Sequence, residues 1–270
     1  MQAPIGPAAT VELVAAVCVA GGLGSLAASW TRIDVLRDQV RALAEHRFCV
    51  NLVLAFPQEE RLEVLCDERV PVISFSWGVR PQLVARAHDA GSQVLVQVGS
   101  VEAARRAADA GADAVIVQGT EAGGHVEGER PLLELLAQVT GLEVPVIAAG
   151  GIADTRAATA ARDAGARAVA AGTAFLVAEE ADRHPGYVER LLAADETILT
   201  DVFSIGWPGA KHRVLRNEAL AAGAPAPDAM PIGTRGGDAE KMALYAGTGV
   251  GTLHAVEPAA AIVARLTLAP

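Results

Sequence analysis

Three stretches of the chain repeat one pattern, and this pattern decides the fold: AHDAGSQVLVQVGS at Ala87–Ser100, AADAGADAVIVQGT at Ala107–Thr120 and ARDAGARAVAAGT at Ala161–Thr173. In each stretch a segment of helical periodicity ends at Ala-Gly, and an apolar run begins almost at once. The glycine supplies the left-handed conformation that ends a helix, and the short link forces helix and strand to pack antiparallel. Apolar strands joined by helices indicate a parallel sheet covered on its outer face.

The same alternation extends along most of the chain. Eight such units favour a closed (β/α)8 TIM barrel, within the α/β class, over an open doubly wound sheet. The expected strands are 3–5, 24–27, 48–54, 71–75, 93–98, 114–118, 145–149 and 168–171. The expected helices between them are 11–20, 34–45, 58–68, 81–90, 101–110, 131–140 and 155–164.

The rhythm changes after the eighth expected strand. Residues 178–248 are richer in Pro, Gly and charge, and only 185–194 has helical character, so we expect a loop excursion over one barrel mouth. Residues 252–268 are Ala-rich and amphipathic, which predicts a closing helix. We therefore expect a single TIM-barrel domain over residues 1–270.

Composition limits the function. Hydrophobic residues make up 51% of the chain and charged residues 20%, which is enough apolar material for a large core. The formal charge of −10, without a Lys/Arg cluster, argues against a nucleic-acid partner and favours a small-molecule substrate. Three cysteines without CxxC spacing indicate neither a disulfide framework nor a metal site. No signal-like or membrane-spanning segment is evident, so a cytoplasmic location is expected, with no membrane partner. Composition leaves the oligomeric state open.

In such a barrel the active site lies at the carboxyl ends of the strands. Gly150-Gly151 and Gly172-Thr173 follow the last two expected strands and would present free backbone N–H groups there. Such groups bind a phosphate without Lys or Arg. A sugar phosphate, a nucleotide or flavin mononucleotide (FMN) would each satisfy this pattern.

Uncharged amide side chains follow other expected strands, and they help to choose among these three phosphate-bearing ligands. Asn51, Gln97 and Gln118 suit hydrogen bonding to a heteroaromatic ring or a ribityl chain, whereas a sugar-phosphate enzyme more commonly needs an ionising group. The sixth expected strand then runs into a glycine-rich turn that ends at His125. With an ordinary pKa of about 6.5, this histidine is either a neutral base or a cation that holds an anionic substrate.

Several stretches resemble, in order, the motifs of the nitronate monooxygenases, formerly called 2-nitropropane dioxygenases. These are QAPIGPAATVELVAAVCVAGGLGSLAAS (2–29), FCVNLV (48–53), QGTEAGGH (118–125), PVIAAGGIAD (145–154) and AGTAFL (171–176). EAGGH (121–125), occurring together with the other motifs, is the element most specific for the family. The resemblance covers nearly the whole chain.

The resemblance implies an FMN-dependent monooxygenase that oxidises alkyl nitronates with O2 to carbonyl compounds and nitrite, with the parent nitroalkanes as a second substrate class left open. His125 matches the active-site histidine of the family. The residues implied in FMN binding are Ala3, Pro4, Ile5, Gly6, Asn51, Gln97, Gln118, Gly123, Gly150, Gly151, Ala170, Ala171, Gly172 and Thr173.

Three departures keep alternatives open. The family commonly has Met at the position of Ile5, and Gln at the positions of Ala170 and Thr248. The family is also similar to the flavin-dependent enoyl-acyl-carrier-protein reductases, so an NAD(P)H-dependent reductase is one alternative. A flavin-binding barrel without this catalysis, or a barrel without flavin, is the other.

Overall fold

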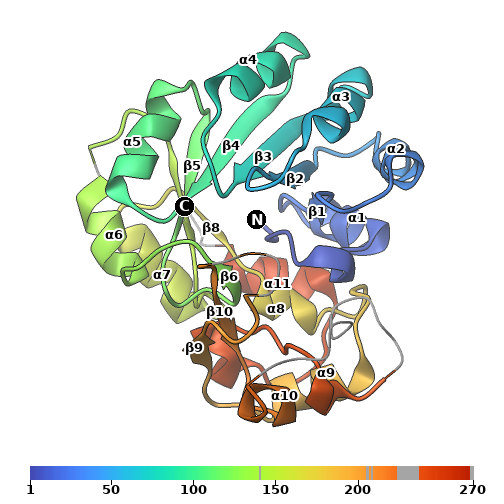
Figure 1. Cartoon of the computed structure of the whole chain (residues 1–270), viewed down its shortest axis with the longest axis vertical. Coiled ribbons are helices and arrows are strands. Elements are labelled where there is room, and N and C mark those ends of the chain that lie inside the picture. The colour runs from blue at the N-terminus through green and yellow to red at the C-terminus, as the bar shows by residue number, and fades with distance from the viewer. Residues whose placement is uncertain (140, 205–206, 208, 224–236, 268–270) are drawn as a thin grey trace.

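A curled parallel sheet forms the centre of the molecule (Figure 1). The computed structural model describes residues 1–139, 141–204, 207, 209–223 and 237–267. Its main sheet has seven strands in the order β1-β2-β3-β4-β5-β7-β8, and every neighbouring pair is parallel. The strands are β1 (Ser25–Ala27), β2 (Cys49–Val53), β3 (Val72–Ser76), β4 (Gln93–Val98), β5 (Ala114–Gln118), β7 (Val146–Ala149) and β8 (Ala168–Ala170).

The expected first strand at Ala3–Ile5 is wrong. Only Gln2 forms a bridge, to Ala171, although the segment does hydrogen-bond on both sides. The amide of Gln2 donates to the Leu23 carbonyl at 2.9 Å, and the amide of Ala3 donates to the Ala171 carbonyl at 2.8 Å. Pro4 has no N–H to continue such a ladder, and the chain turns at once into the 3-10 helix η1 (Gly6–Ala8).

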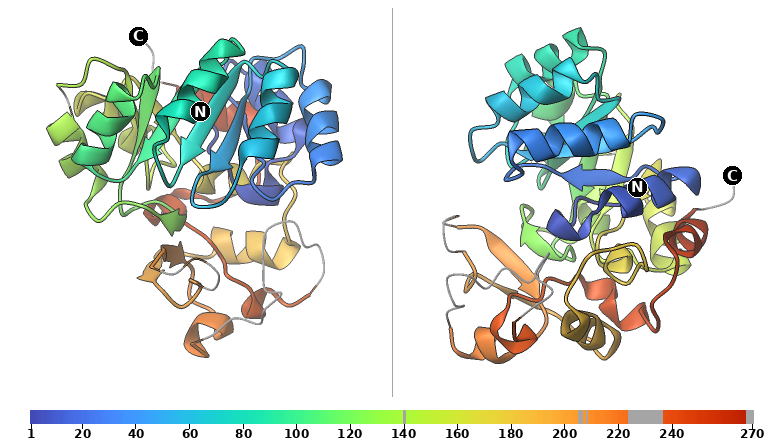
Figure 2. Two further views of the ribbon diagram at one scale, coloured as in Figure 1. Left: turned by 45° about the horizontal axis from the view of Figure 1, so that its top comes forward. Right: turned by 90° about the vertical axis from the view of Figure 1, so that its right-hand side faces the viewer.

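Helices cover the outer face of the sheet (Figures 1 and 2). The prediction that the glycine of each Ala-Gly pair ends a helix in a left-handed conformation is confirmed. Gly91, Gly111 and Gly165 each follow a helix and have φ between 89° and 100°. Seven of the expected helices form with bounds that differ by up to three residues, because terminal residues act as caps. The closing helix, expected at 252–268, begins only after Pro258 and ends at Leu266. The helices are α1 (Val11–Val19), α2 (Ile33–Ala42), α3 (Glu59–Asp67), α4 (Pro81–Asp89), α5 (Val101–Asp109), α6 (Leu132–Val139), α7 (Thr155–Asp163) and the closing helix α11 (Ala259–Leu266).

The inner face of the sheet explains where a ligand can enter. Side chains alternate along a strand, so Ile147 and Ala149 of β7 face the same side. Cys49, Leu95, Ile116 and Ile147 belong to a buried cluster inside the curl. Toward the carboxyl ends the next residues in that row are small or polar, which leaves space above the cluster.

The excursion at 178–248 contains more regular structure than expected in its described part. Besides the expected helix, seen as α9 (Pro185–Leu192), it contains α10 (Glu218–Ala221) and the 3-10 helix η2 (Ala239–Lys241). The short helix α8 (Thr173–Leu176) precedes the excursion, and the 3-10 helix η3 (Thr248–Thr252) follows at its end. The excursion also contributes β9 (Ile198–Thr200) and β10 (Lys211–Val214), which form an antiparallel sheet with β6 (Gly124–Val126) in the order β6-β10-β9.

This second sheet was hidden from sequence patterns because its strands are three or four residues long and β6 lies far from its partners along the chain. The strand arrows of the main sheet point toward this smaller unit (Figure 2). The excursion therefore lies over the mouth at the carboxyl ends of the strands; the sequence had left open which of the two mouths it covers. Expectations for residues 224–236 lie outside the described residues.

The described helices include none that is both long and apolar enough to cross a membrane.

Candidate functional site

One cavity of about 610 Å³ lies at the carboxyl ends of the parallel strands, beneath the excursion. Its size is typical of small-molecule and cofactor sites. Every residue that the sequence pointed to as catalytic or cofactor-binding lines this cavity, whereas the individual roles stay predictions. These residues are Ala3, Pro4, Ile5, Gly6, Asn51, Gln97, Gln118, Gly123, His125, Gly150, Gly151, Ala170, Ala171, Gly172 and Thr173.

The three amides are held in place by the protein. Asn51 donates from Nδ2 to Ser74 Oγ at 3.1 Å, and Gln97 donates from Nε2 to a carboxylate oxygen of Glu127 at 3.4 Å. The Oε1 atom of Gln118 accepts the amide of Glu127 at 2.8 Å, and its Nε2 donates to the His125 carbonyl at 3.3 Å. The Gln118 side chain therefore braces the chain that carries His125, a role that the sequence did not suggest.

The two glycine turns form a backbone cradle. Gly150 and Gly151 have φ of 120° and 68°, conformations that side chains rarely adopt. Among the described residues, the amides of Gly151, Gly172 and Thr173 donate to no other group. A Cβ added at Gly172 would lie 3.2 Å from Ile5 Cγ2, so this backbone is closely approached from the side of the first residues.

These features fit a flavin nucleotide. Free amides at adjacent strand ends suit a phosphate, and held amide side chains suit a ring edge or a ribityl chain. The cavity floor is formed by small residues, including Ala27, Ala149 and Ala170. A flat ring can lie against such a floor, and Ala170 is part of it despite departing from the family pattern.

His125 stands on β6 and enters the cavity among other rings. Its ring centroid lies 4.4 Å from that of Trp207, 4.0 Å from that of His212 and 5.8 Å from that of Tyr245. Burial, and secondarily the neighbouring His212, lowers the pKa of His125 to about 3. The ring is therefore neutral near pH 7, which argues against a standing positive charge that would hold an anionic substrate.

A second histidine, His212, stands beside His125 in the structure. It is the cross-strand partner of His125 on β10 and is completely buried. Neither ring nitrogen makes a hydrogen bond to a described residue. Burial lowers the pKa of His212 to about 4, although the nearby Ala210 carbonyl acts in the opposite direction. That carbonyl favours the protonated ring, but its geometry falls short of a hydrogen bond.

Glu127 is a second group that sequence reasoning missed. It follows β6 two residues after His125 and accepts from Gln97 Nε2 and from the Trp77 amide, both at 3.4 Å. Burial raises the pKa of Glu127 to about 6 against the effect of these two donors. Trp77 itself has a φ of 59°, an uncommon conformation for a bulky residue. Such strain clusters at functional sites.

An aromatic wall (Trp30, Phe56, Trp77 and Trp207) forms one side of the cavity. Trp207 is its centre, with ring centroids 5.2 Å from Phe56, 4.6 Å from Trp77 and 6.4 Å from Trp30. Trp30 and Trp77 come soon after β1 and β3, so the rule of searching strand ends would have found them.

The cavity lining is uncharged. Among the described residues that line it, none is Lys, Arg, Asp or Glu. Glu121, from the EAGGH element, instead accepts the Leu132 amide at 2.9 Å at the start of α6 and braces the loop. Arg213 donates from Nε to the Thr120 carbonyl at 2.8 Å and likewise supports this loop.

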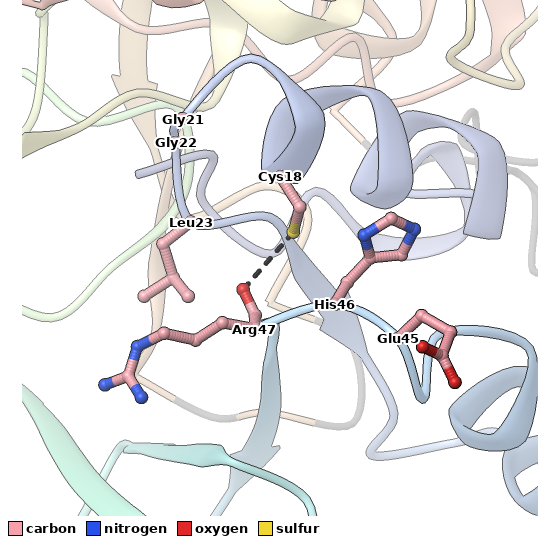
Figure 3. Close-up of a pocket in the computed structure, with 7 residues that line it drawn as sticks. All are labelled: Cys18, Gly21, Gly22, Leu23, Glu45, His46 and Arg47. Atoms are coloured by element: carbon pink, nitrogen blue, oxygen red, sulfur yellow. Dashed lines mark hydrogen bonds between the residues drawn. The ribbon is translucent and has the colours of Figure 1, made fainter.

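A smaller pocket of about 440 Å³ lies at the opposite, amino ends of β1 and β2 (Figure 3). It is lined by Cys18, Gly21, Gly22, Leu23, Glu45, His46 and Arg47, and the Cys18 thiol points toward the Arg47 carbonyl at 3.3 Å. Burial raises the pKa of this thiol, so it is not an activated nucleophile. No predicted site residue lies here.

Comparison with known sequences shows which protein family this chain is similar to. The family model described as nitronate monooxygenase matches residues 42–269. A CoA dehydrogenase from Mycobacterium tuberculosis, which acts on (3aS,4S,5R,7aS)-5-hydroxy-7a-methyl-1-oxo-octahydro-1H-indene-4-carboxyl-CoA, is 39% identical over 82% of this chain. The chain spans only 63% of that relative's length. A nitronate monooxygenase from Pseudomonas aeruginosa is 35% identical, covering 83% of this chain and 80% of that protein.

Solved structures of two enzymes resemble this chain in fold and in sequence. FabK from Thermotoga maritima has a TM-score of 0.86 and 31% identity, covering 98% of this chain and 90% of its own. A nitroalkane oxidase from Streptomyces ansochromogenes has a TM-score of 0.85 and 34% identity, covering 98% and 93%. With the family model spanning most of the sequence, the chain belongs to the nitronate monooxygenase family of flavin-dependent oxidoreductases.

Proposed function

We propose that this protein binds FMN and uses it to oxidise nitroalkanes and their nitronates with O2, giving carbonyl compounds and nitrite. The observation that carries the proposal is the joint position of a buried, neutral histidine, three held amides and a backbone cradle in one cavity. The family and the nitroalkane oxidase neighbour support the same reaction class.

The proposed binding mode divides the cavity in two. The amides of Gly151, Gly172 and Thr173 would hold the phosphate, while Asn51 and Gln97 would face the ring system. The Ala3–Gly6 segment would lie beside the ring. In this proposal residues 1–3, which hydrogen-bond to Leu23 and Ala171, take the place of an eighth strand between β8 and β1 and close the (β/α)8 barrel. When bound, FMN supplies the electron acceptor that no side chain offers.

His125 is the proposed base. In a nitroalkane the α C–H bond breaks, its electron pair stays on the carbon acid as the nitronate, and the proton forms an N–H bond on His125. A neutral imidazole can accept this proton, whereas an already protonated one could not. Because the described lining offers no cation, the neutral nitroalkane should bind better than the anionic nitronate.

A visible absorption spectrum is the first test. The purified protein should show flavin absorbance, or take up FMN when it is added. Anaerobic mixing with 2-nitropropane, propyl-2-nitronate or propionate 3-nitronate should then bleach it. A colourless protein that does not bind FMN, or a flavin that stays oxidised with every nitro compound, would overturn the proposal.

Replacement of the base makes a specific prediction. His125→Asn should retain FMN but lower nitroalkane turnover by at least about 100-fold, because general-base catalysis commonly contributes that much. Turnover is measured by O2 consumption and nitrite release, with FMN content read from absorbance. His254→Gln, at an exposed position, is the matched control. Unchanged turnover in His125→Asn would refute the assigned role.

Oxidoreduction between Cα and Cβ of an acyl thioester is the second candidate. The uncharged cavity favours it, since a thioester is neutral at its reacting carbons, and the relative from M. tuberculosis is named as a CoA dehydrogenase. Anaerobic bleaching by a saturated acyl-CoA, but by no nitro compound, would select this candidate. Rapid bleaching by NADH or NADPH would instead select the reductive direction on enoyl-type substrates.

A further inference from the structure

The cavity concentrates aromatic residues in a chain that has few. Only 4% of the residues are Phe, Trp or Tyr, yet six of these ten line the cavity, and all three tryptophans of the chain belong to the aromatic wall. Such an arrangement needs a reason, because aromatic side chains in a core normally pack against its aliphatic residues. Here they face a space that could hold a ligand.

The wall forms a continuous path from solvent to the proposed base. Trp30 at its outer end is 64% exposed. Its ring contacts Phe56 at 5.6 Å between centroids, and Phe56 contacts Trp207 at 5.2 Å. Trp207 then meets His125 at 4.4 Å. A substrate whose reacting carbon lies at His125 therefore extends its remaining part along these rings.

The chemistry of this path selects the substrate. Neither the wall nor the rest of the described lining offers a charged partner for an anionic or cationic substituent. Aromatic faces bind flat or cyclic hydrocarbon groups through burial of apolar area and through ring-to-ring contacts. A short nitroalkane would leave most of the wall without contact.

We propose that the substrate carries an uncharged hydrocarbon ring that packs on the aromatic wall while its reacting carbon lies beside His125. This inference rests on the proposed function only for the identity of the reacting group, the nitro group. The preference for a ring rests on the aromatic wall. The wall would bind a ring-bearing acyl thioester in the same way, so the second candidate function leaves the inference standing.

A matched set of substrates tests it. 1-Nitropropane, (nitromethyl)cyclohexane and (2-nitroethyl)benzene share the reacting group and differ in the ring. The two ring compounds should have kcat/KM at least about tenfold above 1-nitropropane, since burying a ring of this size contributes more than one factor of ten. Equal kcat/KM for all three would overturn the inference.

Variants localise the effect. Trp207→Ala should lower kcat/KM for the ring compounds about tenfold more than for 1-nitropropane, because only the ring loses a partner on the wall, whereas any effect on the neighbouring His125 is common to all three substrates. Trp207→Phe should restore most of the preference. Leu133→Ala, at a half-exposed position on α6 that does not line the cavity, is the control. An equal loss for all substrates would show a structural role instead.

A binding readout separates this inference from the proposed reaction. Because every tryptophan of the chain lies in the wall, intrinsic tryptophan fluorescence reports on this site alone. Cyclohexanecarboxamide should change it at concentrations at least about tenfold lower than propanamide does. Ring-selective binding without nitroalkane turnover would reject only the proposed reaction, whereas binding without ring preference would reject this inference.

Discussion

At the scale of single residues, burial shifts two titratable groups on the same strand in opposite directions. The pKa of His125 is lowered to about 3 and that of Glu127 is raised to about 6, in both cases chiefly because burial disfavours the charged form. At pH 7 the histidine is neutral and the carboxyl group is mostly ionised. The sequence identifies the histidine, but its protonation state depends on neighbours that come from other segments.

His212 allows a prediction on stability. Its pKa is about 4 in the folded protein and about 6.5 when unfolded, so the unfolded chain binds more protons in between, and stability falls as pH drops below 6.5. His212→Phe should remove this loss, about 2 kcal/mol at pH 5. At pH 7.5 the substitution should be neutral or stabilising, since two buried nitrogens without a hydrogen bond to any described residue disappear.

Urea unfolding at pH 7.5 and pH 5 measures this effect, with His254→Gln as a surface control. If His212→Phe and the wild type lost the same free energy of unfolding between the two pH values, His212 would not be the buried neutral group described above.

Glu127 predicts the opposite pH dependence. Its pKa is raised from 4.5 to about 6, so the folded protein binds more protons in this window, and its contribution to stability is lost as pH rises through 6. Glu127→Gln should therefore raise the free energy of unfolding at pH 7 by up to about 2 kcal/mol and change little at pH 4. Urea unfolding at both pH values is the measurement, and an equal change at both would contradict the assignment.

At the scale of elements, the three-residue strand β6 positions the proposed base although it is too short to be stable alone. Gln118, at the end of β5, hydrogen-bonds to the backbone on both sides of Val126. On its other edge β6 pairs with β10. The position of His125 thus depends on both sheets.

The turn after β7, at Gly150-Gly151, is predicted to be needed for FMN binding. A Cβ added at Gly151 would lie 2.5 Å from Thr248 Oγ1 and 2.9 Å from Glu121 Cβ, at a φ of 68°. Gly151→Ala should therefore distort the cradle and weaken FMN binding by at least about tenfold, the equivalent of roughly 1.4 kcal/mol. FMN affinity is measured by fluorescence titration.

Gly91→Ala is the matched control, because Gly91 also has a positive φ, of 89°, but a Cβ there meets nothing within 4 Å. Both variants carry the backbone strain, and only Gly151→Ala should lose FMN. Equal FMN affinity in the two proteins would show that the turn does not hold the phosphate.

At the scale of the whole molecule, the cavity exists because a parallel sheet curls and a distant segment covers its carboxyl ends. The aromatic wall draws its rings from the segments after β1, β2 and β3 and from the excursion. Trp207 joins them although it lies 130 residues beyond Trp77. Substrate selection by this wall is thus a property of the assembled fold.

The parallel sheet and its outer helices are predictable from the sequence, because Ala-Gly turns, strand length and helical periodicity are local signals. The gathering of the amides and glycine turns of the strand ends in one cavity is predictable too, since the ends of parallel strands share one edge. Four features follow only from the folded chain: the end of the ladder at Pro4, the β6-β10-β9 sheet, the burial of His212 and Glu127, and the aromatic wall. Each of these depends on contacts between segments far apart in the chain, and short strands and buried charges carry no local pattern that reveals such contacts.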